Sequence, residues 1–189
     1  MQEYLELCKD LLVNGLMFSD EGLSPWQFKN IIVVALRLGE FEWTENFIHK
    51  YNERLPEQYR DNSVTFNLAR LNWYQKKYDK VVELLREVEY EDFAYNLGAK
   101  SMLLTTYYET DEIEPLYSLL ESFRVYLNRD KKMPEQQKTY YRNLIKLTKK
   151  LTKIMPGDKK AIEKFKTEIN ETKGIADLRW LKEKIAELE

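Results

Sequence analysis

Cysteine, histidine, glycine and proline are all scarce in this chain of 189 residues. Cys8 is the one cysteine, so an internal disulfide is impossible and a reducing compartment is expected. Six glycines and five prolines are too few for the many turns of an all-β sandwich, whereas helices joined by short loops need few. His49 is the one histidine, which leaves little material for nucleophilic or metal chemistry.

Long apolar runs are also missing. The longest uninterrupted run covers six residues, 31–36, far short of the roughly 20 that cross a bilayer. The N-terminal sequence MQEYLELCKDLL places acidic residues early and alternates charged with apolar residues, unlike a secretion signal. We therefore expect a soluble, cytoplasmic protein that does not associate with membranes.

Motifs that would indicate catalysis are not found either. The sequence has no glycine-rich phosphate loop, no H-E-x-x-H and no G-x-S-x-G. A Cys–His dyad would require the fold to bring Cys8 and His49 together. The expectation is a protein without enzymatic activity, cofactor or metal.

Apolar residues recur at spacings of three and four along nearly the whole chain, which indicates an all-α protein. Helix starts are marked by Ser24-Pro25 and by Asp79, Asp92, Asp111 and Asp158 as N-caps. The first helix has no capping residue before it, which suggests the C-terminal part of a longer protein. The predicted helices cover residues 1–20, 25–38, 42–54, 61–76, 79–88, 92–109, 111–129, 134–154, 158–171 and 175–188.

Three helix pairs share one pattern. A large apolar residue stands at the turn of each pair, at Phe41, Tyr78 and Ile113, with spacings of 37 and 35 residues. Seven residues after each one lies a further apolar residue, so the second helix of each pair presents the same face: Ile48, Leu85 and Leu120. This self-similarity predicts repeated helical hairpins.

The pattern resembles the tetratricopeptide repeat, which has a period of 34 residues. The segment Leu38-Gly39-Glu40-Phe41, the repeat-ending Pro56 and the small Ala69 carry the resemblance, while Ile32 and Leu104 depart from it at the small-residue site. The resemblance implies a single domain, a right-handed α-solenoid of about four helix-turn-helix repeats. Its parts would be an N-terminal helix (1–20), three hairpins (24–129), a longer irregular hairpin (134–171) and a C-terminal capping helix (175–189).

In a tetratricopeptide solenoid the first helix of each pair lines a concave groove. Aromatic side chains interleaved with cations suit a groove that binds a peptide or protein, although the same rings could instead pack between repeats. The resemblance implies these groove positions: Trp26, Lys29, Arg37, Phe66, Arg70, Trp73, Tyr74 and Tyr108. A non-catalytic protein-interaction scaffold is the function that these positions favour.

Charge is distributed unevenly along the chain. Residues 129–166 hold 13 Lys or Arg against four acidic residues, a net charge of +9, although the whole chain carries −2. A basic stripe runs along the predicted helix 134–154: Lys138, Arg142, Lys146, Lys149, Lys150 and Lys153. Such a stripe either binds nucleic acid or an acidic partner, which is the alternative function, or forms a solvated face paired with acidic residues of the chain itself.

Overall fold

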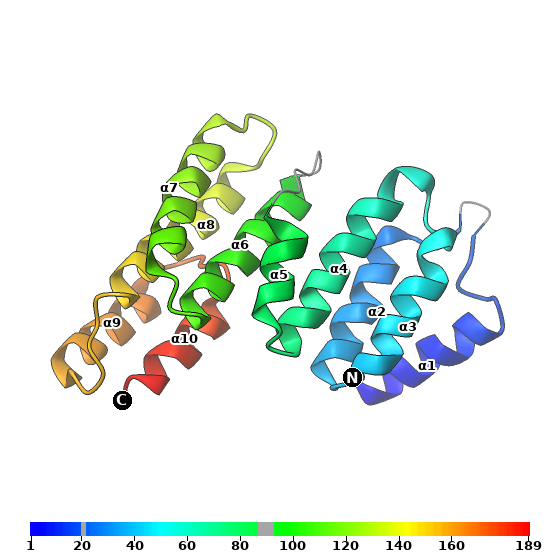
Figure 1. The fold of residues 1–189 in the computed structure, drawn as a ribbon, viewed down its shortest axis with the longest axis horizontal. Helices are drawn as coiled ribbons and strands as arrows, with labels where there is room; N and C mark the ends of the chain where they lie inside the picture. Colours follow the sequence, from blue (N-terminus) through cyan, green and yellow to red (C-terminus); the bar gives the residue numbers. More distant parts are fainter. Residues whose placement is uncertain (20–21, 87–92) are drawn as a thin grey trace. The chain divides into compact units, whose positions relative to one another are not determined.

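The computed structural model describes residues 1–19, 22–86 and 93–189. These residues form α-helices and two short 3-10 helices, Asn52–Arg54 and Glu57–Tyr59, and contain no β-strand (Figure 1). The prediction of an all-α protein is confirmed. The helices are α1 (Gln2–Val13), α2 (Pro25–Arg37), α3 (Phe41–Tyr51), α4 (Arg60–Tyr74), α5 (Tyr78–Leu85), α6 (Phe93–Glu109), α7 (Ile113–Arg129), α8 (Glu135–Leu151), α9 (Lys159–Glu171) and α10 (Leu178–Glu187).

The predicted helix starts have mixed outcomes. Pro25 is the first residue of α2, and the Asp158 carboxylate caps α9 by accepting a hydrogen bond of 3.0 Å from the Ala161 amide. The predicted cap at Asp111 is wrong: this residue has a φ of 56° in the left-handed turn before α7. Asp79 lies inside α5 instead of preceding it, and the cap predicted at Asp92 lies outside the described residues.

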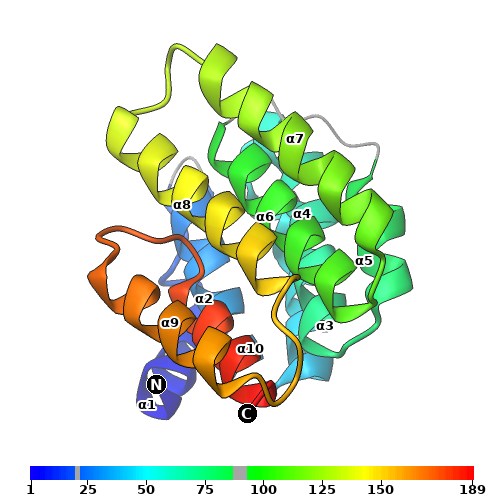
Figure 2. The same cartoon turned by 90° about the vertical axis from the view of Figure 1, so that its left-hand side faces the viewer.

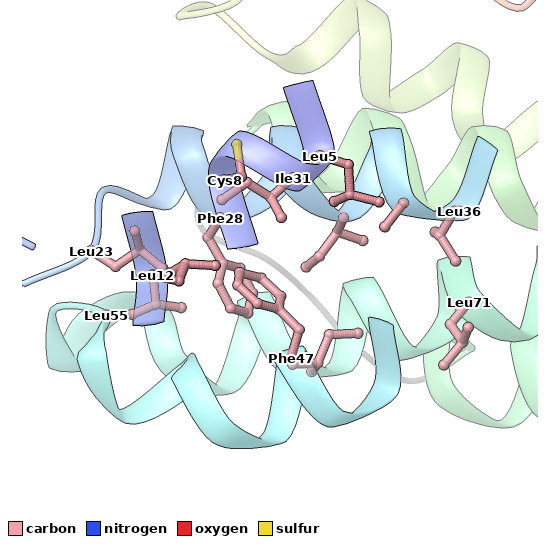
Figure 3. Close-up of a cluster of buried hydrophobic side chains, with 13 residues drawn as sticks. Leu5, Cys8, Leu12, Leu23, Phe28, Ile31, Leu36, Phe47, Leu55 and Leu71 are labelled. Carbon is pink, nitrogen blue, oxygen red and sulfur yellow. The ribbon is translucent and has the colours of Figure 1, made fainter. Parts of the chain in front are cut away.

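The chain divides into two compact units, Met1–Thr106 and Tyr107–Glu189, and the division falls within α6. In the first unit α1 packs against α2, and the pair formed by α2 and α3 packs against α4. Leu5, Cys8 and Leu12 point from α1 into the core that α2 and α3 form around Phe28 and Phe47 (Figure 3). The 13 side chains of this cluster show why α1 is an integral part of the first unit.

The second half of the first unit is held by contacts between α4, α5 and α6. α4 packs along α5. The indole Nε1 of Trp73 on α4 donates a hydrogen bond of 3.0 Å to Thr105 Oγ1 on α6. A side chain at Gly98 would overlap the Phe66 ring, with a Cβ only 2.6 Å from Cζ, so glycine permits the close approach of α6 to α4.

In the second unit α7 and α8 form a pair, and α10 packs against α8 and α9 (Figure 2). The connection from α9 to α10 is attached to α8. Asn143 Nδ2 donates a hydrogen bond of 2.8 Å to the Gly174 carbonyl, and the Ala176 amide donates one of 3.1 Å to the Tyr140 carbonyl. These bonds set the position at which α10 begins.

Candidate interaction surfaces

The outward face of α2 carries three of the predicted groove residues. Trp26, Lys29 and Arg37 are exposed, and they lie on the side of the helix opposite the buried Phe28 and Ile31. The Trp26 side chain is 70% exposed, an unusual setting for an indole, which contributes much apolar area when it is covered. This face is accessible to a partner.

Phe66 does not belong to an accessible surface, contrary to the prediction. Its ring is 2% exposed and meets the Tyr95 ring edge-to-face at 5.2 Å. The Arg70 guanidinium lies over the Phe66 ring, 4.6 Å from its centroid. The predicted groove residue Phe66 is a packing residue because α6 closes over it, and Arg70 is half-buried beside it.

Trp73 and Tyr74 are half-buried on α4, where their rings meet edge-to-face at 5.6 Å. The hydrogen bond from Trp73 to Thr105 occupies the one polar group of the indole. Trp73 therefore contributes to packing between α4 and α6, whereas Tyr74 packs against the buried cluster around Phe28 and Phe47, and both rings present only part of their area to solvent. Packing within the fold describes these two rings better than free exposure.

Tyr108 lies in the second unit and is covered by the chain's own C-terminal helix. The Trp180 ring meets it edge-to-face at 5.2 Å, and burial raises the pKa of the Tyr108 hydroxyl. The neighbouring Glu109 carboxylate accepts hydrogen bonds from Trp180 Nε1 at 2.9 Å and from Lys184 Nζ at 3.0 Å. The position predicted to face a partner is filled by α10.

The basic stripe is largely paired within the chain. Lys138 is buried and donates a hydrogen bond of 2.6 Å to the Asp130 carbonyl, so it fixes the loop between α7 and α8. Arg142 forms an ion pair with Glu135 and donates to Asn128 Oδ1 at 3.1 Å. These two cations serve the structure of the second unit.

The next three cations of the stripe meet acidic residues on α7 and α9. Lys146 and Lys150 lie 2.9 and 2.6 Å from the Glu168 carboxylate and lower its pKa through their hydrogen bonds. Lys149 lies 3.3 Å from Glu121. Within the ranges that the structure describes, Lys153 is the stripe residue that makes no ion pair or hydrogen bond through its side chain. The stripe thus matches the second interpretation, a face paired with the chain's own acids.

Cys8 and His49, the two residues considered for a catalytic dyad, differ in exposure. Cys8 is buried, and burial raises the pKa of its thiol, which opposes formation of the nucleophilic thiolate. His49 is exposed on α3. No group of three or more His, Cys, Asp or Glu side chains in the described parts of the chain is placed to hold a metal ion.

One exposed apolar surface was not predicted. Five of the nine large apolar side chains that the structure shows as exposed lie in α1 or beside it: Met1, Tyr4, Leu7, Val13 and Leu16. The signal was present in the sequence, because Tyr4, Leu7 and Leu11 repeat the spacing of the buried Leu5, Cys8 and Leu12 one residue earlier. Apolar residues at both sets of positions give α1 a wider apolar arc than its contact with α2 and α3 covers.

Comparison with models of known protein families, with curated proteins and with solved structures gives no match. Among residues 1–19, 22–86 and 93–189, no helix combines the length and the apolar composition needed to cross a membrane.

Proposed function

We propose that this protein is a non-catalytic interaction scaffold, a solenoid of tetratricopeptide-like hairpins that binds a peptide or protein along the outward face of α2. The observation that carries the proposal is the 70% exposure of Trp26 on the same helix face as Lys29 and Arg37. Exposure of the apolar indole area of Trp26 to water is unfavourable, and the ring contributes nothing to the core. Tryptophan and arginine are the residue types that often dominate the binding energy of interfaces.

The spacing of contacts in the first unit supports repeated hairpins. Trp73 and Thr105, which bond each other from α4 to α6, are 32 residues apart, near the tetratricopeptide period of 34. α2 also packs against α4, so first helices of successive pairs are neighbours. In the proposed solenoid, these neighbouring first helices would line one continuous groove. α2 would be the first helix of that lining, and its outward face would be exposed to the partner.

The alternative function, binding of a nucleic acid or acidic partner by residues 129–166, has weaker support. A ligand phosphate would have to displace Glu168 and Glu121 from Lys146, Lys149 and Lys150. Charge reversal of Lys153, which spares those ion pairs, tests it. Single-stranded RNA binding that disappears in Lys153→Glu at physiological salt would favour this alternative.

The scaffold proposal is tested by affinity capture with Trp26→Ala and Arg37→Glu. Both side chains are exposed, so these variants are expected to stay folded, whereas changes at Arg70 or Trp73 would also disturb packing. Lys160→Glu on α9 is a matched surface control. We expect the variants of α2 to lose partners that the wild type and the control retain. Retention of every partner by Trp26→Ala with Arg37→Glu would refute the proposal.

A further inference from the structure

The exposed side of α1 is a second apolar surface, separate from the outward face of α2. We define the α1 strip as Tyr4, Leu7 and Leu11, which follow one another at spacings of three and four residues and share one side of the helix. Leu7 is 56% exposed and Tyr4 41%. The opposite boundary of the apolar arc, formed by Leu5, Cys8 and Leu12, is already buried against α2 and α3.

The spacing of the α1 strip is the spacing at which two helices pack. Residues at i, i+3 and i+7 form the seam that one helix offers to another, and an extended strand would not match their rise. Val13, the last residue of α1, and Leu16 beyond it are exposed as well. The shape of the surface therefore selects a helix as its occupant.

The charged residues beside the α1 strip indicate which charge a complementary helix would carry. Glu3 and Asp10 are seven residues apart on one side of the strip, both are exposed, and neither forms an ion pair with any residue that the structure describes. Lys9 lies on the other side of the helix, 5.3 Å over the Trp43 ring and 2.9 Å from Glu6. Two unpaired carboxylates border the strip and no described cation of α1 does.

We propose that the α1 strip binds a basic amphipathic helix of another protein. Apolar residues of the partner at i, i+3 and i+7 would cover Tyr4, Leu7 and Leu11, and Lys or Arg beside them would face Glu3 and Asp10. The carboxylates of Glu3 and Asp10 disfavour binding of an anionic lipid surface or a nucleic acid, because both of these ligands bind to cationic side chains. The proposal concerns a different surface from the one on α2 and does not depend on it.

The test uses the full chain and a labelled synthetic peptide that forms a helix with a leucine strip flanked by lysines. Two matched peptides accompany it, one with the lysines replaced by glutamates and one with the same residues in scrambled order. We expect submillimolar binding of the striped basic peptide alone, measured by fluorescence anisotropy. Leu7→Glu should weaken it by about tenfold or more, because one leucine-sized contact is lost. Val125→Ser, an exposed apolar residue on α7, is the control and should bind as the wild type does.

A charge variant tests the role of Glu3 and Asp10 while the apolar residues of the α1 strip stay unchanged. Glu3→Lys with Asp10→Lys should reverse the preference, from the basic to the acidic peptide, and circular dichroism should show an unchanged helix content. The proposal is overturned if the basic peptide does not bind, if Leu7→Glu binds it as the wild type does, or if the charge variant shows no reversal. Binding of the wild type to vesicles containing phosphatidylserine, lost in Leu7→Glu, would overturn it in favour of a membrane surface. Loss of peptide binding in Leu7→Glu with unchanged capture by the α2 face would separate this proposal from the scaffold proposal.

Discussion

The ammonium of Lys184 lies 2.9 Å from a carboxylate oxygen of Glu109, although the two residues are 75 positions apart in the sequence. Both side chains are mostly buried, with exposed fractions of 10% and 18%. Glu109 also accepts the hydrogen bond from Trp180. One carboxylate at the end of α6 therefore holds two side chains of α10, and it explains why the C-terminal helix takes this place in the second unit.

Removal of Lys184 should destabilise the second unit. Lys184→Met keeps the apolar stem but leaves the Glu109 carboxylate without its main cation, and we expect a loss of about 2 kcal/mol in the free energy of unfolding. Urea unfolding followed by tryptophan fluorescence measures it. Arg124→Ala removes an exposed partner of Glu121 and should cost less than about 0.5 kcal/mol. Equal losses in the two variants would show that burial adds nothing to the pair.

The contribution of Lys184 should depend on pH at the alkaline end. Burial lowers its pKa, but hydrogen bonds to Glu187 and Glu109 outweigh burial, so the pKa is raised above its ordinary value of 10.5. A group whose pKa is higher in the folded than in the unfolded state contributes its full stabilisation at pH values below its unfolded-state pKa. That stabilisation is lost as the pH rises through the folded-state pKa. The stability difference between wild type and Lys184→Met should therefore shrink above pH 10.5. A difference that stays constant there would argue against the ion pair.

Gly174 should tolerate no side chain. A Cβ at this position would overlap the Tyr140 ring, and the backbone φ is 70°, in the left-handed region. Gly157 has a similar φ of 78° but open space where a Cβ would stand. Gly157→Ala should cost about 1 kcal/mol for the backbone alone, and Gly174→Ala should cost more because α10 is displaced. Thermal unfolding compares them, and equal midpoints would contradict the predicted overlap.

Alanine variants of Phe66 and Trp26 should differ in stability, because Phe66 is buried and Trp26 is exposed. Phe66→Ala leaves a cavity beside Gly98 and should lower stability by about 3 to 4 kcal/mol. Trp26→Ala removes an exposed ring and should change stability by less than about 0.5 kcal/mol. Chemical unfolding of both variants tests this. A large loss in Trp26→Ala would mean that the indole supports the fold and would remove the reason to assign it to a partner.

Local sequence signals were sufficient for the secondary structure. The spacing of apolar residues and the breaks at Gly39, Pro56 and Gly157 locate the helices because each depends on residues a few positions apart. Caps were less predictable. Asp111 is a residue type that often caps helices, but its backbone lies in the left-handed region in the turn between α6 and α7.

The exposure of the predicted groove residues could be predicted only in part, because exposure depends on contacts between distant segments. Phe66 on α4 and Trp26 on α2 are both aromatic residues within amphipathic helices, and the sequence around them gives no reason to expect one to be buried and the other exposed. α6 covers Phe66 through Gly98, while no described segment covers Trp26. The basic stripe illustrates the same limit, since its acidic partner Glu168 lies on a different helix, 18 residues from Lys150.

The amino-acid sequence by itself determined that this chain is helical and roughly where its helices lie, since these properties follow from interactions within one or two turns. It did not determine every helix end, because the predicted helix 1–20 ends at Val13 and Asp79 lies inside α5. Tertiary structure alone decided which side chains remain available to a partner. It buried Phe66, covered Tyr108 with Trp180 and paired Lys146 with Glu168, and it left Leu7 and Trp26 in solvent. The physical reason is that burial and charge pairing are properties of two segments together, and a sequence pattern describes only one of them at a time.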